Sequence, residues 1–262
     1  MKKTLLLLAL LAGQKLNAQE VKKQVLNNKD KTIFSSNIGL TNASGSFDLK
    51  QVDINQSSTF TTSPATSNTS RYGFKIAAAA ELPFKNKHWS FNPELALVSK
   101  GLESTLTFNE TGSSTTNIYK IKTNFIEASF GLNYYLDQNK KLFVGFAPTI
   151  SIGAGGGVKG TSSTYDSSSQ ETLSGPISFG IKYDGQWSAN NDNMFHFKSI
   201  HFGSSFTVGY KFSDLIYSKL LYNVGFNNLF PTNTITQGFN SSTISGTFNT
   251  SYLSLSVGVA IK

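Results

Sequence analysis

The chain has 262 residues, a formal net charge of +8 and no cysteine. The absence of cysteine excludes a disulfide framework and any thiolate metal site. Charged residues make up only 15% of the chain, whereas aromatic residues reach 13% and there are 22 glycines. No basic helix or aromatic–basic platform accompanies the positive charge, so we expect no nucleic-acid partner.

The first residues have the three parts of a secretory signal. Lys2 and Lys3 precede an apolar run over residues 5–11, and Ala18 offers a cleavage point. The run is far shorter than the roughly 20 residues that a spanning helix needs. The sequence therefore predicts a cleaved signal peptide over 1–18, a polar periplasmic leader over 19–31 and one domain over 32–262.

Apolar residues in this domain recur with a period of two. Near the C-terminus, every second residue from Leu253 to Ile261 is apolar, and the residues between are Ser, Gly or Ala. Such alternation is typical of strands with two different faces. We predict eight such strands, which in chain order cover residues 32–41, 72–82, 89–97, 126–136, 142–152, 202–212, 220–226 and 253–261.

The segments between these strands alternate between short and long. Short turns follow the second, fourth and sixth strands, whereas long inserts rich in Ser, Thr and Asn follow the others, at about 51–70, 105–117, 155–193 and 227–247. Bacterial outer-membrane barrels combine short periplasmic turns, long outer loops and an even number of strands. The prediction is an all-β, antiparallel transmembrane β-barrel of eight strands.

Two local features qualify this topology. Residues 177–183 also alternate, either as a hairpin above the membrane or as an extra pair of strands, so ten strands are the alternative. Pro148 cannot donate to a ladder, which predicts a bulge or a local break in the fifth strand.

A soluble β-sandwich would need apolar inner faces, and the second face of these strands is too polar for that.

Charged residues on the inward face are the main candidates for a functional site. If Leu82 pairs with Trp89, Lys75 lies opposite Ala96 and Glu94 is its diagonal neighbour. An eight-stranded barrel is only wide enough to be filled by side chains. We predict an ion-pair network that plugs the lumen, with a gated or proton-conducting path as the alternative. Its members are Lys75, Glu94, Lys100, Glu127, Lys211 and Lys219.

Aromatic residues near the strand ends on the outer face are predicted to lie at lipid head-group depth, as in other membrane proteins. They are Trp89, Phe91, Tyr134, Tyr210 and Tyr222.

Support for catalysis is weak. The chain has three histidines, His88, His196 and His201, and none lies in a cluster with metal-ligand spacing. There is no Gly-x-Ser-x-Gly motif, and the glycines at 153–157 lack the Lys-Ser/Thr of a phosphate loop. We expect no enzyme activity, cofactor or metal. The enzymatic alternative is a barrel hydrolase that uses His201 beside Ser205.

Several short motifs occur together in the order of a known family. The third strand carries Glu94-Leu95 followed by Lys100-Gly101. The fourth carries Ile126-Glu127 and the Tyr134-Tyr135 pair, with Ser129 where a Pro is common, and the fifth carries Ala147-Pro148. Over residues 32–262 the chain resembles the PorT-like outer-membrane β-barrel family of Gram-negative bacteria, although it ends in Ile261-Lys262 and not in an aromatic residue. The resemblance implies fold and location, and the activities within the family are diverse.

These observations together predict an exported barrel in the cell outer membrane with a structural or interaction role. Its expected partners are outer-membrane lipids and a periplasmic or surface protein. The outer loops are expected to be solvated cover, or alternatively a surface that recognises a glycan or protein through residues such as Trp187. The alternatives for the whole protein are a narrow transport channel, a secretion-accessory barrel or a barrel hydrolase.

Overall fold

The computed structural model describes residues 32–55, 58–62, 64–84, 88–110, 113–164, 167–180, 195–230, 233–237 and 240–261. The predicted signal peptide and leader, and Trp187 in the third insert, lie outside the described residues. No helix in these ranges is long and apolar enough to cross a membrane.

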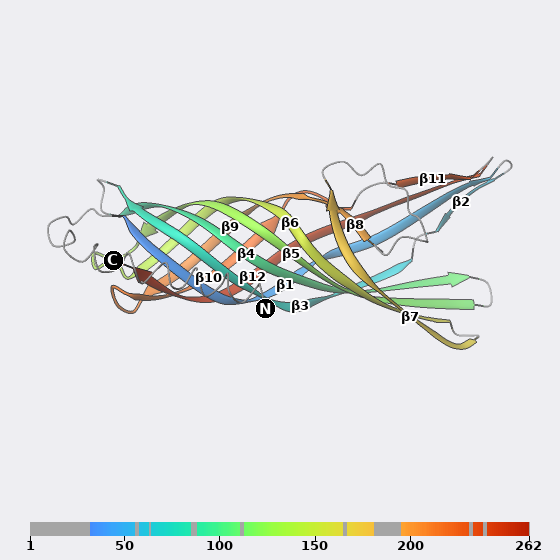
Figure 1. Cartoon of the computed structure of the whole chain (residues 1–262), viewed down its shortest axis with the longest axis horizontal. Helices are drawn as coiled ribbons and strands as arrows, with labels where there is room; N and C mark the ends of the chain where they lie inside the picture. The colour runs from blue at the N-terminus through green and yellow to red at the C-terminus, as the bar shows by residue number, and fades with distance from the viewer. Residues whose placement is uncertain are drawn as a thin grey trace, which may run out of the picture.

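Eight long strands form a closed antiparallel ring (Figure 1). Each strand pairs with the next along the chain, and the last pairs with the first from Phe34↔Ile261 onward. This confirms the predicted eight-stranded barrel. The strands are β1 Ile33–Asn55, β3 Ala65–Pro83, β4 Trp89–Glu110, β5 Ser113–Tyr135, β6 Leu142–Thr164, β9 Ile200–Lys211, β10 Ile216–Gly225 and β12 Asn240–Ile261.

The outer face of the ring carries an apolar belt. In β12, Leu255 and Val257 are 61% and 53% exposed, whereas the neighbouring Ser254 and Ser256 are buried inside. The same alternation leaves Phe130 of β5 and Phe206 of β9 exposed. Lipid around this belt offers the backbone no hydrogen bonds, and a closed ring of paired strands needs none from it.

Tight turns join the strands at the end of the barrel where the chain terminates (Figure 1). In the turn between β5 and β6, the Asp137 carboxylate accepts hydrogen bonds from the backbone N–H groups of Lys141 and Leu142, at 2.8 and 2.7 Å. Lys140 in this turn has φ 55°. These contacts close the hairpin without a longer connection. In an outer-membrane barrel the short-turn end is periplasmic.

The strands are much longer than the sequence predicts. β1, β5 and β6 have 23 residues each, which corresponds to about 76 Å of strand, whereas crossing a bilayer takes roughly 9–11 residues. The predicted polar loops at 51–70 and 105–117 are therefore largely strand, in β1, β3, β4 and β5. These segments are rich in Ser, Thr and Asn, so their composition resembles that of a loop, although their backbones pair as ladders. The ladders form an extension beyond the belt (Figure 1).

Four further described strands belong to this extension and not to the ring. β2 Ser58–Thr62 pairs with β1, β11 Asn233–Gln237 pairs with β12, β7 Ser167–Gly180 pairs with β6, and β8 Phe195–Lys198 pairs with β7 in parallel. The alternating segment from residue 177 therefore begins in β7, above the ring, and adds no strand to it. Residues 181–183 of that segment lie outside the described residues.

The irregularities of β6 lie in two places. Ala147 and Pro148 of β6 have no paired residue in β5, but the β5–β6 register is the same on both sides of this break. On its other side, Pro148 still pairs with Ser204 of β9. The register shift comes further along, between Asn124 and Phe125, where Gly155 has φ 115°. Glycine suits this left-handed backbone because it has no Cβ.

Candidate functional site

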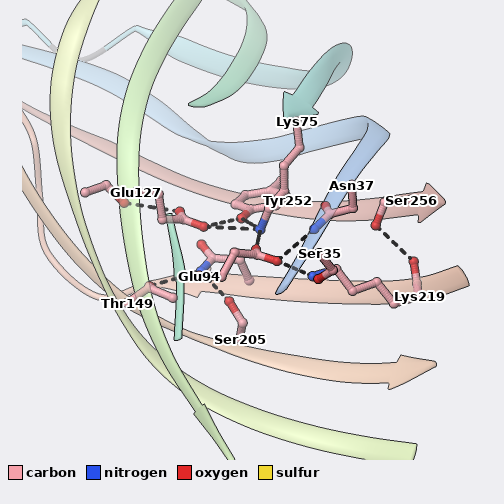
Figure 2. Close-up of polar contacts among 12 residues, drawn as sticks. Ser35, Asn37, Lys75, Glu94, Glu127, Thr149, Ser205, Lys219, Tyr252 and Ser256 are labelled. Carbon is pink, nitrogen blue, oxygen red and sulfur yellow. Dashed lines mark hydrogen bonds and ion pairs between the residues drawn. The ribbon is translucent and has the colours of Figure 1, made fainter. Parts of the chain in front are cut away.

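Five charged side chains from four strands gather inside the ring, and Figure 2 shows four of them. β3 supplies Lys75, β4 supplies Glu94 and Lys100, β5 supplies Glu127 and β10 supplies Lys219. Each lies at an inward position of its strand, and none of these side chains is more than 8% exposed. We call these five residues the lumen network.

Glu94 lies between two lysines. One of its oxygens is 2.8 Å from Lys75 Nζ, and the other forms a short ion pair with Lys219. The same second oxygen accepts a hydrogen bond from the Asn37 amide at 3.0 Å. Both carboxylate oxygens of this buried group therefore have charged or polar donors, as a buried charge requires.

Glu127 has the second set of contacts. Lys75 Nζ and Lys100 Nζ each lie 3.7 Å from one of its oxygens. The Tyr252 hydroxyl donates to the first oxygen at 2.5 Å, and the Ser151 hydroxyl donates to the second at 3.1 Å. Lys75 thus contacts both carboxylates and joins the two halves of the network (Figure 2).

Lys100 differs from the other two lysines. Its Nζ has no hydrogen-bond acceptor among the described residues and lies 4.9 Å from the ring centres of Phe125 and Tyr252. These distances suit a cation–π interaction, which partly stabilises a desolvated ammonium group. With three lysines and two glutamates, the lumen network has one formal positive charge in excess.

Lys211, which the sequence placed with this group, lies elsewhere. Its Nζ is 2.9 Å from a Glu81 oxygen and donates to the Tyr135 hydroxyl at 2.6 Å. The Tyr135 hydroxyl in turn makes a short hydrogen bond to Glu81. Lys211 and Tyr135 both end their strands at the short-turn end, so this second cluster lies nearer the periplasmic mouth.

The predicted register between β3 and β4 is wrong by two residues. Leu82 pairs with Phe91 and Lys75 with Val98, so Ala96 lies opposite Ala77. The reason is the turn, which is wider than expected because the ladder closes at Pro83↔Ser90. A bulge between Arg71 and Lys75 adds a further register shift. The Lys75–Glu94 contact still forms, because the long lysine side chain reaches along the lumen.

Sequence reasoning missed four side chains that complete these clusters. Tyr252, Asn37, Glu81 and Tyr135 supply hydrogen bonds to the charges. Tyr252 follows the same alternation as Ser254 and Ser256, so extending the final predicted strand by one step would have found it.

Beyond the lumen network, the inward positions become apolar. On β4 the inward residues change from Glu94 and Lys100 to Leu102 and Leu106, which are almost fully buried. Phe197 and Phe248 stack with their ring centres 4.5 Å apart. We call this cluster the outer plug; its members are Phe47, Leu102, Leu106, Ile121, Phe125, Val158, Ile177, Phe197, Leu229, Phe230 and Phe248.

A cavity of about 60 Å³ lies on the periplasmic side of the network. Glu81 and Lys211 line it together with Glu94 and Lys219, so it separates the two charge clusters. One water needs roughly 10–15 Å³ of such space. The cavity has room for a few waters, and tightly packed side chains lie between it and the outer plug.

The five outer-face aromatic residues lie at two heights. Trp89 and Tyr134 contact each other with ring centres 4.8 Å apart at the short-turn end, where Phe91 and Tyr210 also lie. Tyr222 lies further along its strand, opposite Phe206 of β9 and Leu253 of β12.

The histidines form no catalytic arrangement in the described part of the chain. His201 is buried, its ring centre lies 5.8 Å from that of Phe125, and its Nε2 has no partner there. The Ser205 hydroxyl accepts a hydrogen bond from Asn223. His88 contacts the Tyr135 carbonyl at 3.0 Å, and the side chain of His196 is outside the described set. Within the same residues no His, Asp and Glu group has metal-binding geometry.

Comparison with known proteins gives the following matches. No curated protein matches the chain. Among solved structures it is similar to Neisserial surface protein A (NspA), with 9% identity, a TM-score of 0.33 and coverage of 86% of this chain and 96% of that one. It is also similar to Ail of Yersinia pestis, with 10% identity, a TM-score of 0.29 and coverage of 88% of this chain and 99% of that one. For the outer membrane protease OmpT of Escherichia coli, the identity is 8%, the TM-score is 0.36, and the coverage is 90% of this chain and 99% of that one. Residues 20–231 match the model of a family described as "Outer membrane protein beta-barrel domain". The chain therefore belongs to this family of outer-membrane β-barrels.

Proposed function

We propose that this protein is a sealed outer-membrane barrel with a structural or interaction role, and that it neither conducts solutes nor catalyses a reaction. The observation that carries the proposal is the filling of the lumen. The lumen network crosses the ring at membrane level, and the outer plug closes the space beyond it.

A narrow transport channel is the first alternative. A solute crossing the barrel would have to separate Lys75 from two carboxylates and then displace the stacked rings of Phe197 and Phe248. Separating a buried ion pair costs roughly 3–5 kcal/mol, and the rings add to that barrier. This favours a closed ground state.

A hydrolase is the second alternative. Hydrolysis needs a nucleophile, a base and an orienting group within hydrogen-bond reach, open to substrate. His201 is buried, and the Ser205 hydroxyl is bonded to Asn223. The site therefore lacks both the geometry and the access, and we place no substrate there.

Recording from planar bilayers tests the sealed lumen directly. The purified protein is expected to incorporate and to give no large, stable openings, and a porin added to the same bilayers shows that incorporation is measurable. Stable openings of the native protein would contradict the proposal. Openings that appear only after Phe248→Ala would support a closing role for the outer plug.

The interaction role is tested by crosslinking in intact cells. A photoreactive residue at Ser44, which is exposed on the extension, is expected to capture a protein partner. The same residue at Leu255, which faces lipid, is the matched control. Equal protein capture at both positions, or at neither, argues against a partner that binds the extension. The PorT resemblance also permits a secretion-accessory role, which predicts that deleting the gene retains cargo in the periplasm.

A further inference from the structure

Four cationic side chains lie on the outer face of the consecutive strands β3, β4, β5 and β6, just beyond the apolar belt. Arg71 of β3 pairs with Gly101 of β4, which pairs with Lys122 of β5. Two residues further along β5, Lys120 pairs directly with Lys159 of β6. Directly opposed residues share a face of a sheet. We call Arg71, Lys120, Lys122 and Lys159 the basic patch.

Glycine residues separate the cations within the sheet. Gly101 stands between Arg71 and Lys122, and a Cβ built on it would meet the Arg71 Cβ at 3.0 Å. On the other side of Lys122 the partner in β6 is Gly157. The Arg71 side chain therefore lies across Gly101, with its Cδ also within 4 Å of that position, and glycine at both neighbours of Lys122 brings the cations close together.

Within the part of the chain that the structure describes, the four cations of the patch form one ion pair with a carboxylate. Lys120 and Lys159 are like charges at directly paired positions, an arrangement that destabilises a sheet. The acidic neighbour in the row is Glu103, 3.8 Å from Lys120. Four cations beside one carboxylate leave three positive charges in excess, and an external anion would offset them.

The distance of the basic patch from the apolar belt places it at the level of the lipid head groups, outside the hydrocarbon core of the membrane. The last apolar row runs through Leu97 and Ile126, and Lys122 lies four residues beyond Ile126. That is about 13 Å along the strand, or roughly 10 Å in height for a strand tilted by about 40°. The Lys122 Nζ lies 5.9 Å from the centre of the Phe74 ring, and long cationic side chains pack in this way at a membrane interface.

The patch is confined to one side of the barrel. On the adjoining strands, residues 42–48 of β1 and 246–252 of β12 pair with each other in the extension and contain no Lys or Arg. In that stretch of β1 the charged residue is Asp48. A general role in solubility would not require such asymmetry, whereas a bound lipid would.

We propose that the basic patch binds the phosphate groups of the anionic glycolipid in the outer leaflet of the outer membrane. Arg71 and Lys122 lie nearest the hydrocarbon and face the first phosphate layer, and Lys120 with Lys159 forms the row above. This lipid contact adds to the proposed function and is independent of whether the lumen conducts.

Native mass spectrometry of the detergent-solubilised protein tests the proposal with diphosphorylated lipid A as the probe. The native protein is expected to retain it, and Lys120→Gln with Lys159→Gln should weaken retention about thirtyfold, as expected for two surface cations. The matched control is Lys140→Gln with Lys141→Gln, which removes the same charge at the periplasmic turn and should leave retention unchanged.

Two further lipids identify the recognised group. Dephosphorylated lipid A should not be retained, and phosphatidylglycerol should be retained more weakly than diphosphorylated lipid A. Equal retention of phosphatidylglycerol, equal loss in the control variant, or no loss in the patch variant would each overturn the proposal.

Discussion

Glu94→Gln removes the carboxylate that pairs with two buried lysines. The side chain is 3% exposed, and its oxygens contact Lys75 and Lys219. An amide of the same shape leaves both ammonium groups without their nearest counter-charge. Removing one partner of a buried pair costs about 3–5 kcal/mol, so we expect the free energy of unfolding to fall by that amount.

The matched control is Glu103→Gln on the extension. Glu103 is 35% exposed and lies 3.8 Å from Lys120, so its loss should cost less than about 1 kcal/mol. Unfolding by urea in detergent micelles, followed by tryptophan fluorescence, measures both variants. Equal losses in the two variants would refute the reasoning, because the burial of Glu94 would then have no energetic consequence.

A combined variant keeps the test decisive if Glu94→Gln does not fold. Glu94→Met with Lys219→Met removes a carboxylate and one of its lysines together, and Lys75 still contacts Glu127. Replacing a buried pair by apolar residues of similar size is often neutral or stabilising. This variant should therefore be more stable than Glu94→Gln, and the opposite order would contradict the ion-pair account.

Three further predictions use the same unfolding assay. Lys100→Met removes the excess positive charge and should leave stability within about 1 kcal/mol of native or raise it; a loss above about 3 kcal/mol would show that Lys100 is needed as a counter-charge. Phe248→Ala leaves a cavity in the outer plug and should cost roughly 3–5 kcal/mol, whereas a negligible loss would mean that the plug is loosely packed. Gly73→Ala would place a Cβ 2.1 Å from the Ser99 carbonyl oxygen and should cost about 1–3 kcal/mol; a neutral effect would contradict that close approach.

The faces of the strands could be read from the sequence, but their lengths could not. Alternation from Leu253 to Ile261 separates a lipid face from a lumen face wherever the two differ in polarity. Beyond the membrane, Thr105 and Thr107 are outward positions, whereas Leu106 between them is buried in the outer plug. A composition of Ser, Thr and Asn then resembles a loop, although the backbone pairs to Glu110.

One signal in the sequence marks the upper edge of the belt. On β4 the apolar residues are Leu95 and Leu97 on the outer face, and then Leu102 and Leu106 on the inner face. The side of the strand that carries leucine changes because the solvent changes: lipid lies outside the lower part, and water surrounds the upper part. A search for the point at which leucine moves from outward to inward positions would have predicted the outer plug.

The inward positions of the lumen-network residues follow from alternation, whereas the contacts between them depend on register. Lys75 and Glu94 were placed on the inward face by the period of two alone. The separation of Lys211 from them depends on how far each strand is offset from its neighbour around the ring, which a single sequence does not reveal. For β3 and β4, the turn that closes at Pro83↔Ser90 sets this offset.

The chain has no native cysteine, so single-cysteine labelling measures the closure of the lumen most directly. Ser254→Cys is a near-isosteric change inside the ring, and Ser44→Cys is its exposed counterpart on the extension. With a charged, water-soluble thiol reagent on the folded protein in lipid vesicles, the account predicts rapid modification at residue 44 and none at residue 254. Modification of residue 254 at a rate close to that of residue 44 would mean a water-filled lumen and would contradict the account.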